Sequence, residues 1–332
     1  MAKTATVAGT TWGIPLAMCL VRNGYRVTLW EYDPELAGSL QRERSTAKFP
    51  GLALPDAVHV TSDLPHGEAI GELLVIAVPS QHVRWLAGEV GPIPEGALAA
   101  IAAKGLEMPS LMRLSEVVSD VMSPVHLAAV SGPCIAVEVA RGVPTAAVAA
   151  SEAPGDAERL RDALMTERFR IYTSDDLPGV ELGGSLKNII AIAAGLCDGL
   201  GFGDNTKAGL ITRGLAEIAR LGVVLGARGE TFSGLSGMGD LVVTAFSPHS
   251  RNRRLGEAIA RGRSLEEAQA ALGQVAEGVR TAESAQRLSS RVGVEMPITE
   301  QVCRVLFEGE SPQEAVESLM LRQPKAEPER LR

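Results

Sequence analysis

The sequence predicts an α/β fold, with a doubly wound N-terminal domain followed by an all-α C-terminal domain. In the first half, short strand-like runs alternate with helix-like segments, which indicates a parallel sheet covered by helices. From about Asp175 onward the strand signals stop, and long Ala/Leu/Ile/Val stretches with helical periodicity take over. We therefore predict one domain over residues 1–180 and a second over residues 181–332.

Each element has its own signal in the sequence. The strand-like runs of the first half are short and apolar, and they cover residues 4–8, 26–31, 73–78, 97–103, 127–131 and 145–150. A helix over residues 13–23 follows the first strand. The helical stretches of the second half cover residues 181–198, 206–225, 251–260, 264–272, 278–291, 297–307 and 312–320.

Composition narrows the function classes. The chain has 332 residues, 45% of them hydrophobic and 22% charged, which is typical of a globular protein with a sizeable core. The net charge of −8 argues against a nucleic-acid or anionic-membrane surface. The four cysteines form no CxxC pair, so we expect no metal site and no disulfide framework. With no signal peptide and no membrane-spanning stretch recognised, we expect a cytoplasmic protein.

The turn after the first strand is a candidate phosphate loop. Gly9, Thr10, Thr11, Trp12 and Gly13 join that strand to a helix, where a dinucleotide-binding fold places its glycine-rich turn. The strict G-x-G-x-x-G spacing is absent, and only Gly13 keeps its place. Gly9 can supply the tight turn, and the two threonines add hydroxyl donors for a pyrophosphate. A plain βα turn remains the alternative.

Glu31 ends the second strand, 18 residues after Gly13. An acidic side chain near this position bonds the ribose hydroxyls of NAD in Rossmann-type domains, and its charge repels the extra phosphate of NADP. The alternative is an ordinary surface acid at a strand end. Together with the glycine turn, Glu31 favours a dinucleotide-binding domain.

Three further strand ends carry polar or glycine-rich turns, at Ser80–Gln81, Lys104–Gly105 and Ser131–Gly132. Ligands bind beyond the carboxyl ends of parallel strands, so these turns favour a ligand crevice. Each is also compatible with simple turn chemistry.

Lys187 is a single charge in a helix that is apolar nearly all round. Lysines are almost never fully buried without a partner, and desolvation lowers the pKa of a buried ammonium toward the range used for proton transfer. The alternative is a lysine at the edge of the apolar face whose ammonium reaches solvent. The helix alone does not separate the two interpretations.

A second polar cluster follows in the helical half. Asp240 lies in a glycine-rich turn, and Ser250, Arg251 and Asn252 stand at an expected helix start. Ser250 is a good helix cap, and an arginine there can bind a phosphate in bidentate fashion. In an acidic protein, this cluster indicates an anion site rather than a basic surface.

These residues together resemble the bacterial-type NAD(P)-dependent glycerol-3-phosphate dehydrogenases over nearly the whole chain. The matching segments keep the family's order and spacing, and they are residues 10–13, 77–81, 104–107, 131–133, 181–188, 199–205, 231–234 and 249–253. The resemblance implies interconversion of dihydroxyacetone phosphate and sn-glycerol 3-phosphate, which supplies glycerophospholipid synthesis, and it suggests a homodimer.

The resemblance also implies residue roles. Lys187 is expected as the general acid/base, with Asp240 beside it. The positions expected to hold the phosphorylated substrate are Lys104, Gly132, Cys134, Lys187, Asp240, Ser250, Arg251 and Asn252. Those that the resemblance places at the dinucleotide are Thr11, Trp12, Lys104, Ala136, Arg251, Val275 and Glu277. The first turn and the end of the second strand add Gly9, Thr10, Gly13 and Glu31 to this expectation.

Three departures from the family pattern bear on affinity. Ala8 and Thr10 replace glycines of the phosphate loop, and Cys134 replaces a Ser or Thr by a weaker donor. Tyr32 and Asp33 stand where many relatives carry arginines suited to NADP. We therefore expect NAD or NADP as cofactor, with a preference for NADH.

Two other functions remain open from the residues. A β-hydroxyacid dehydrogenase has a similar two-domain plan and a catalytic lysine, but the Ser250–Asn252 cluster favours a phosphorylated substrate. A dinucleotide sensor would keep the fold but has no use for Lys187. Oligomeric state and feedback regulation are not determined by the sequence.

Overall fold

The computed structural model describes residues 3–122, 126–273 and 275–323. The chain forms two compact units. The first unit contains residues up to 103 and residues 114–177, and the second contains residues 104–113 and 178 onward. The first unit ends three residues before the predicted boundary at 180. Lys104–Arg113 belongs to the second unit although it precedes residue 177 in the chain. The sequence does not predict this, because it indicates two consecutive domains.

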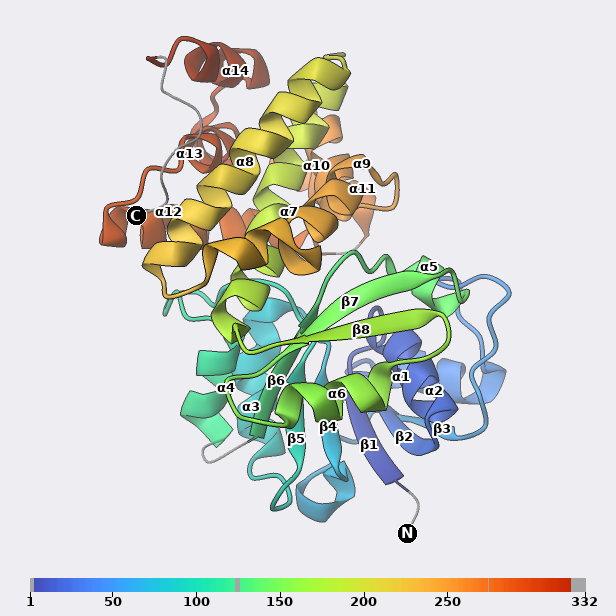
Figure 1. Cartoon of the computed structure of the whole chain (residues 1–332). Coiled ribbons are helices and arrows are strands. Elements are labelled where there is room, and N and C mark those ends of the chain that lie inside the picture. Colours follow the sequence, from blue (N-terminus) through green and yellow to red (C-terminus); the bar gives the residue numbers. More distant parts are fainter. Residues whose placement is uncertain (1–2, 123–125, 274, 324–332) are drawn as a thin grey trace. The chain divides into compact units, whose positions relative to one another are not determined.

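The first unit is built on one eight-stranded sheet with the order β3-β2-β1-β4-β5-β6-β7-β8 (Figure 1). Its strands are β1 (Lys3–Ala8), β2 (Tyr25–Trp30), β3 (Val58–Thr61), β4 (Leu73–Ile76), β5 (Leu98–Ile101), β6 (His126–Ser131), β7 (Thr145–Ala150) and β8 (Phe169–Ser174). Its α-helices are α1 (Gly13–Arg22), α2 (Pro34–Glu43), α3 (Val83–Val90), α4 (Leu114–Met122), α5 (Ala136–Ala140) and α6 (Asp156–Leu164).

The sheet is parallel except at one pair. β6 and β7 run antiparallel, whereas β7 and β8 are parallel to each other. The register of β1 against β4 pairs Val7 with Val75 and Ala8 with Ile76, and all four side chains are fully buried. Strands covered on both faces are continuously apolar, which explains why the central strands were recognised in the sequence. The predicted doubly wound sheet is confirmed, with β3 and β8 as additional edge strands.

The second unit is built from helices, together with the non-helical loop Lys104–Arg113. Its α-helices are α7 (Leu177–Gly199), α8 (Asp204–Val224), α9 (Asp240–Phe246), α10 (Arg251–Ala260), α11 (Leu265–Leu272), α12 (Glu277–Val292), α13 (Pro297–Cys303) and α14 (Pro312–Met320). α9 was not predicted, and α7 begins four residues earlier than expected.

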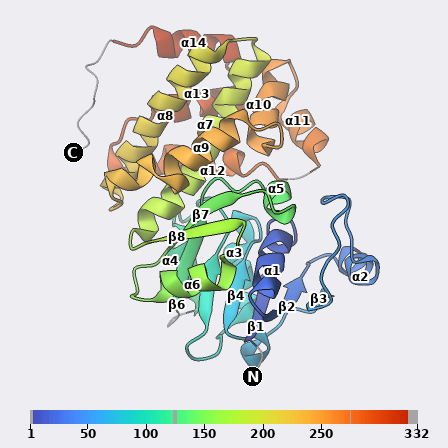
Figure 2. The ribbon, with the colours of Figure 1, turned by 45° about the vertical axis from the view of Figure 1, so that its right-hand side comes forward.

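α7 is the central helix of the second unit, with α8, α10 and α12 around it (Figure 2). Close approach is possible because the neighbours present glycines. A Cβ on Gly214 of α8 would lie 2.7 Å from the side chain of Ile190, and one on Gly278 of α12 would lie 2.7 Å from the carbonyl oxygen of Asn188. α7 is long and apolar enough to cross a membrane, but 94% of its most apolar stretch is buried inside the structure. It is therefore the core helix of this unit.

Candidate functional site

Lys187 lies on α7 and is buried, with 6% of its surface exposed. Its Nζ donates to Asp240 Oδ1 at 2.5 Å and to Thr244 Oγ1 at 2.6 Å. The ammonium does not reach solvent along an apolar face, so the snorkelling alternative is wrong. A buried cation is stable here because a carboxylate and a hydroxyl replace the water it loses.

The position of Asp240 follows from close helix packing. A Cβ on Gly183 of α7 would lie 2.8 Å from the carbonyl oxygen of Ser236, in the π-helical turn η4 (Leu235–Gly239) that leads directly into α9. Asp240 is the first residue of α9 and is 1% exposed. Thr244 follows one turn later, and its hydroxyl donates to the carbonyl oxygen of Asp240 at 2.6 Å. The hydroxyl oxygen is thereby oriented to accept from Lys187.

Lys104 brings a second ammonium to the same carboxylate. Its Nζ lies 2.5 Å from Asp240 Oδ2, and its side chain is 19% exposed. The loop that carries Lys104 is attached to α7, because Ser185 Oγ accepts from the amide of Gly105 at 2.9 Å. Arg113, at the end of that loop, forms an ion pair with Glu181 at 3.0 Å. The sequence predicts Lys104 at a strand end, and the structure shows in addition that its ammonium contacts Asp240.

The three charged groups leave a local excess of one positive charge. Asp240 is shared between Lys104 and Lys187, one ammonium on each carboxylate oxygen. Such a carboxylate cannot neutralise both cations, so the cluster attracts anions. The arrangement therefore suits a substrate that is itself negatively charged.

The start of α10 confirms the predicted cap and positions the polar cluster. Ser250 Oγ accepts from the amide of Arg253 at 3.2 Å. Asn252 Nδ2 donates to Asn188 Oδ1 at 2.9 Å, and Asn252 Oδ1 accepts from the amide of Gly278 at 2.9 Å. Asn188 directly follows Lys187, so this buried bond couples the start of α10 to the lysine.

Arg251 is the first residue of α10, beside that bond. Burial lowers the pKa of its guanidinium, and the charge of Glu277 acts in the opposite direction. Within the described ranges its side chain makes no hydrogen bond or ion pair. An arginine pKa starts so high that the group keeps its charge. A partly buried, unpaired guanidinium beside a helix start is a favourable position for a phosphate.

The turn after β1 in the first unit has the geometry of a phosphate loop. Gly9 has φ +100°, and a Cβ there would lie 2.7 Å from the carbonyl oxygen of Ala77. Only glycine fits this position. A Cβ on Gly13 would lie 2.8 Å from the side chain of Val7, so this glycine lets α1 pack closely on β1. Gly9 thus supplies the tight turn, although Ala8 and Thr10 stand where the family pattern has glycines.

Glu31 is held in place by the same turn. The Thr10 hydroxyl donates to Glu31 Oε2, and the amide of Asp33 donates to Glu31 Oε1 at 3.3 Å. In this structure the Thr10 hydroxyl is therefore directed to Glu31 rather than to a pyrophosphate. Asp33 caps α2 by accepting from the amide of Glu35 at 2.9 Å. Two carboxylates consequently stand at the end of β2.

The remaining first-unit residues lie at or near the ends of strands. Gly132 follows β6 with φ +139°, and a Cβ there would lie 2.9 Å from the Cα of Ala147 on β7. Cys134 and Ala136 are partly buried against the core of the first unit. The Trp12 ring packs edge-on against Phe169, with ring centroids 6.4 Å apart. Contact of these residues with substrate or dinucleotide stays a prediction.

The structure therefore gathers part of the predicted site within the second unit: Lys104, Lys187, Asp240 and Asn252 are linked there to one another or through Asn188. Val275 is 50% exposed, and Glu277 begins α12. Sequence reasoning missed Thr244, whose only signal is its spacing of four residues from Asp240. It also missed Lys48, whose Nζ lies 3.3 Å from Thr11 Oγ1 beside the first turn.

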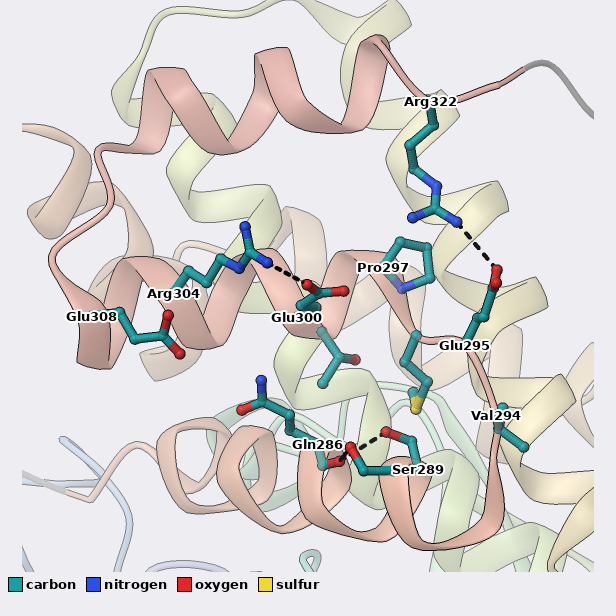
Figure 3. A pocket seen from close by; sticks show the side chains of 12 residues that line it. Gln286, Ser289, Val294, Glu295, Pro297, Glu300, Arg304, Glu308 and Arg322 are labelled. Carbon is teal, nitrogen blue, oxygen red and sulfur yellow. Dashed lines mark hydrogen bonds and ion pairs between the residues drawn. The ribbon is translucent and has the colours of Figure 1, made fainter.

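A polar cavity of roughly 400 Å³ lies elsewhere in the second unit, between α12 and α13 (Figure 3). Both arginines of its lining are already paired, Arg304 with Glu300 at 2.6 Å and Arg322 with Glu295 at 3.2 Å. Glu308 adds a further negative charge. The lining is therefore unsuited to a phosphate, and none of the predicted site residues belongs to it.

Among the residues that the structure describes, no three or more His, Cys, Asp or Glu side chains gather as a metal site. None of the four cysteines, all of which lie in the described ranges, forms a disulfide, and burial raises the pKa of Cys19 and Cys197 to about 11.

A doubly wound sheet with a glycine turn and an acidic strand end, joined to a helical unit with a buried lysine, defines a nicotinamide-dependent oxidoreductase. Family models identify the particular class. The N-terminal model of NAD-dependent glycerol-3-phosphate dehydrogenase matches residues 3–157, and the C-terminal model matches residues 176–317. The chain belongs to the NAD-dependent glycerol-3-phosphate dehydrogenase family.

Individual relatives match over nearly their full length. The chain is 47% identical to glycerol-3-phosphate dehydrogenase [NAD(P)+] of Chlorobium luteolum, over 97% of this chain and 98% of the relative. It is 48% identical to the enzyme of the same name from Pelotomaculum thermopropionicum, over 96% and 93%. The crystal structure of glycerol-3-phosphate dehydrogenase from Coxiella burnetii matches with a TM-score of 0.91 and 39% identity, over 97% and 99%.

Proposed function

We propose that this protein interconverts dihydroxyacetone phosphate and sn-glycerol 3-phosphate with NAD(H) or NADP(H), and so supplies glycerol 3-phosphate for glycerophospholipid synthesis. The observation that carries the proposal is the buried cluster in which Asp240 binds both Lys187 and Lys104. In this proposal Lys187 is the proton donor, and the excess positive charge of the cluster favours an anionic substrate.

The residues of the first unit fit a dinucleotide. The absence of a side chain at Gly9 leaves the backbone open at the start of α1, where a pyrophosphate is stabilised by helix amides. Glu31 offers its carboxylate to ribose hydroxyls. When bound, the nicotinamide supplies the hydride that is added to the carbonyl carbon, or accepts it in the reverse direction.

Lys187 has the role of general acid in this proposal. During reduction the carbonyl carbon gains the hydride, and the carbonyl oxygen gains a proton from the Lys187 ammonium. The neutral amine left behind is reprotonated from solvent. Asp240 and Thr244 hold Nζ in one orientation, and the positive charge of Lys104 stabilises the negative charge that develops on the oxygen.

Arg251 is assigned to the substrate phosphate. Its guanidinium is free of hydrogen bonds and ion pairs within the described residues, and it stands at a helix N-terminus next to the Asn188–Asn252 bond. A phosphorylated three-carbon ketone would thus be held at one end by Arg251 and protonated at the other by Lys187. A β-hydroxyacid without a phosphate would leave Arg251 unsatisfied.

NADH oxidation by purified protein with dihydroxyacetone phosphate tests the proposal directly. We expect turnover with this ketone and little or none with dihydroxyacetone or with unphosphorylated 3-hydroxyacids in the reverse direction. Equal activity on the unphosphorylated compounds would contradict the assignment of Arg251. Absence of turnover with every substrate would favour a dinucleotide sensor.

We infer a preference for NADH over NADPH from the two carboxylates at the end of β2. Glu31 is fixed by Thr10, so it cannot easily swing away from a 2′-phosphate, and Asp33 adds a second negative charge. Steady-state kinetics with each cofactor decide this point. Glu31→Gln should narrow the difference between kcat/KM for NADH and kcat/KM for NADPH. A large advantage of NADPH in the unmodified protein would contradict the inference.

We further propose a cytoplasmic homodimer, as the family resemblance suggests. Size-exclusion chromatography with light scattering measures the mass of the particle. A mass of one chain across a range of protein concentrations would contradict the dimer, and fractionation of cells that express the protein tests its location.

A further inference from the structure

The start of α10 is locked against α7 by direct backbone contact. A Cβ added to Gly195 of α7 would overlap the carbonyl oxygen of Arg253, and one added to Gly256 of α10 would overlap that of Ile192. A Cβ on Gly199 would lie 2.6 Å from the Cβ of Ala260. Helices approach this closely only where side chains are absent, so the crossing has little freedom to slide.

Beside this crossing lies a charge cluster that the proposed mechanism does not use. Asp198, near the end of α7, accepts from Arg253 Nε at 2.6 Å and forms an ion pair with Lys207 of α8. The side chains are 15% exposed for Asp198, 18% for Arg253 and 10% for Lys207. Ion pairs sheltered from solvent to this degree are stronger and more fixed than surface pairs.

The cluster surrounds the turn that leads into α10. The Lys207 ammonium lies 4.9 Å from the ring centre of Phe246, the last residue of α9, within the range of a cation–π contact. Arg253 donates through its amide to the Ser250 hydroxyl and through its Nε to Asp198, in addition to its longer ion pair with Glu257. Asp198 and Lys207 therefore connect α7 and α8 to both ends of the segment between α9 and α10.

We propose that Asp198 is a positioning residue for the anion-binding start of α10: its carboxylate, held between Lys207 and Arg253, sets the placement of Arg251 and Asn252. This inference rests on the proposed function, because it assigns Asp198 to the precision with which the substrate phosphate is held. Asp198 acts through Arg253 and does not itself touch the substrate. Small displacements of a positioned group are expensive in such sites.

Positioning and simple electrostatics make opposite predictions for Asp198→Asn. Removing one negative charge raises the local positive potential, so electrostatics alone predicts tighter binding of a phosphate. Loss of the Asp198 carboxylate releases Lys207 and loosens Arg253, so positioning predicts weaker binding. The sign of the change in KM for dihydroxyacetone phosphate therefore separates the two.

The experiment compares steady-state kinetics of full-length variants with dihydroxyacetone phosphate and NADH. For Asp198→Asn we expect KM for the phosphorylated ketone to rise about tenfold while kcat changes less than about threefold. The inhibition constant of inorganic phosphate should rise in parallel. Glu257→Gln is the matched control, because Glu257 lies 3.6 Å from Arg253 and its loss changes the charge equally. We expect its KM to stay near that of the unmodified protein.

A double variant, Asp198→Asn with Lys207→Met, restores the net charge of the cluster. A KM that stays raised supports positioning, and a return to the unmodified value overturns it. An unchanged or lower KM in Asp198→Asn also overturns the inference. Should Asp198→Asn fail to fold, Lys207→Met alone removes the ion pair between Lys207 and Asp198. It is expected to raise KM for dihydroxyacetone phosphate about threefold, and no rise would overturn the inference. An inactive unmodified protein would instead refute the proposed function.

Discussion

The second unit buries two carboxylates to the same degree, and their partners are of different kinds. Asp240 and Glu217 are each 1% exposed. Asp240 is bound by two lysine ammoniums. Glu217 on α8 accepts from the amides of Ile298 and Thr299, at 2.8 and 2.9 Å, and from the Thr299 hydroxyl at 2.7 Å.

The difference lies in what the partners can do. The amides around Glu217 cannot give up their protons, so the carboxylate only satisfies the first turn of α13, whose own N-cap Met296 supplies no side-chain bond. The ammonium of Lys187 beside Asp240 is the group that we propose as a proton donor. Burial of a carboxylate is thus not by itself a sign of catalysis, and the mobility of the partner's proton is the informative property.

The largest effect is expected at Lys187, the proposed proton donor. Lys187→Met should lower kcat about 10³-fold, because the carbonyl oxygen loses its general acid while Asp240 keeps Lys104 as partner. NADH binding, measured by fluorescence titration, should be retained. Turnover near the unmodified level would show that Lys187 is a structural charge like Glu217.

The next effect tests the structural carboxylate. Glu217→Ala should lower the free energy of unfolding by about 3 kcal/mol, because two amides and a hydroxyl lose a buried acceptor. Urea denaturation measures this loss. Specific activity of the folded fraction should hardly change; a variant that stays folded yet loses its activity would place Glu217 in the functional site.

A smaller effect is expected for the hydroxyl that orients Lys187. Thr244→Val preserves the shape of the side chain but removes the acceptor, so kcat should fall about tenfold with little change in thermal stability. Thr244→Ser, which keeps the hydroxyl, is the control and should retain most of the activity. Equal losses in both variants would indicate a packing role.

The finest test is the pH dependence of stability. Burial raises the pKa of Glu217 above its ordinary value of 4.5, outweighing its hydrogen bonds. As pH rises above about 4.5, the unfolded chain therefore releases this proton before the folded chain does, and stability falls relative to Glu217→Gln. Below that pH the penalty disappears. Parallel stability curves for the two proteins would contradict the direction of this shift.

The sequence predicted those parts of the fold that depend on continuous apolar runs. It missed β3 and β8, which lie at the sheet edges and alternate buried with exposed residues, so their apolar signal is weak. It could not predict that β7 is antiparallel to β6, because strand direction depends on how the connection through the short helix α5 turns.

The candidate site shows the same division. Lys187 was recognisable because a charge in an apolar helix is unusual. The bond between Asn188 and Asn252 joins residues 64 positions apart, and Glu217 reaches α13 over 82 positions, so neither pairing has a local signal. The position of Thr244 beside Lys187 could be predicted only if α9 were known. The seven residues of α9 are too few to be recognised by periodicity.

The loop Lys104–Arg113 has a consequence for dissection of the protein. It is contributed by the first half of the chain but belongs to the second unit, bound to α7 through Ser185 and Glu181. A fragment that begins at residue 178 would lack this loop. Asp240 would then contact one of its two lysine ammoniums, and Glu181 would lose its ion pair with Arg113. Neither half of the gene therefore encodes a complete module, and shuffling the C-terminal half onto another dinucleotide domain would succeed only if this ten-residue insertion travelled with it.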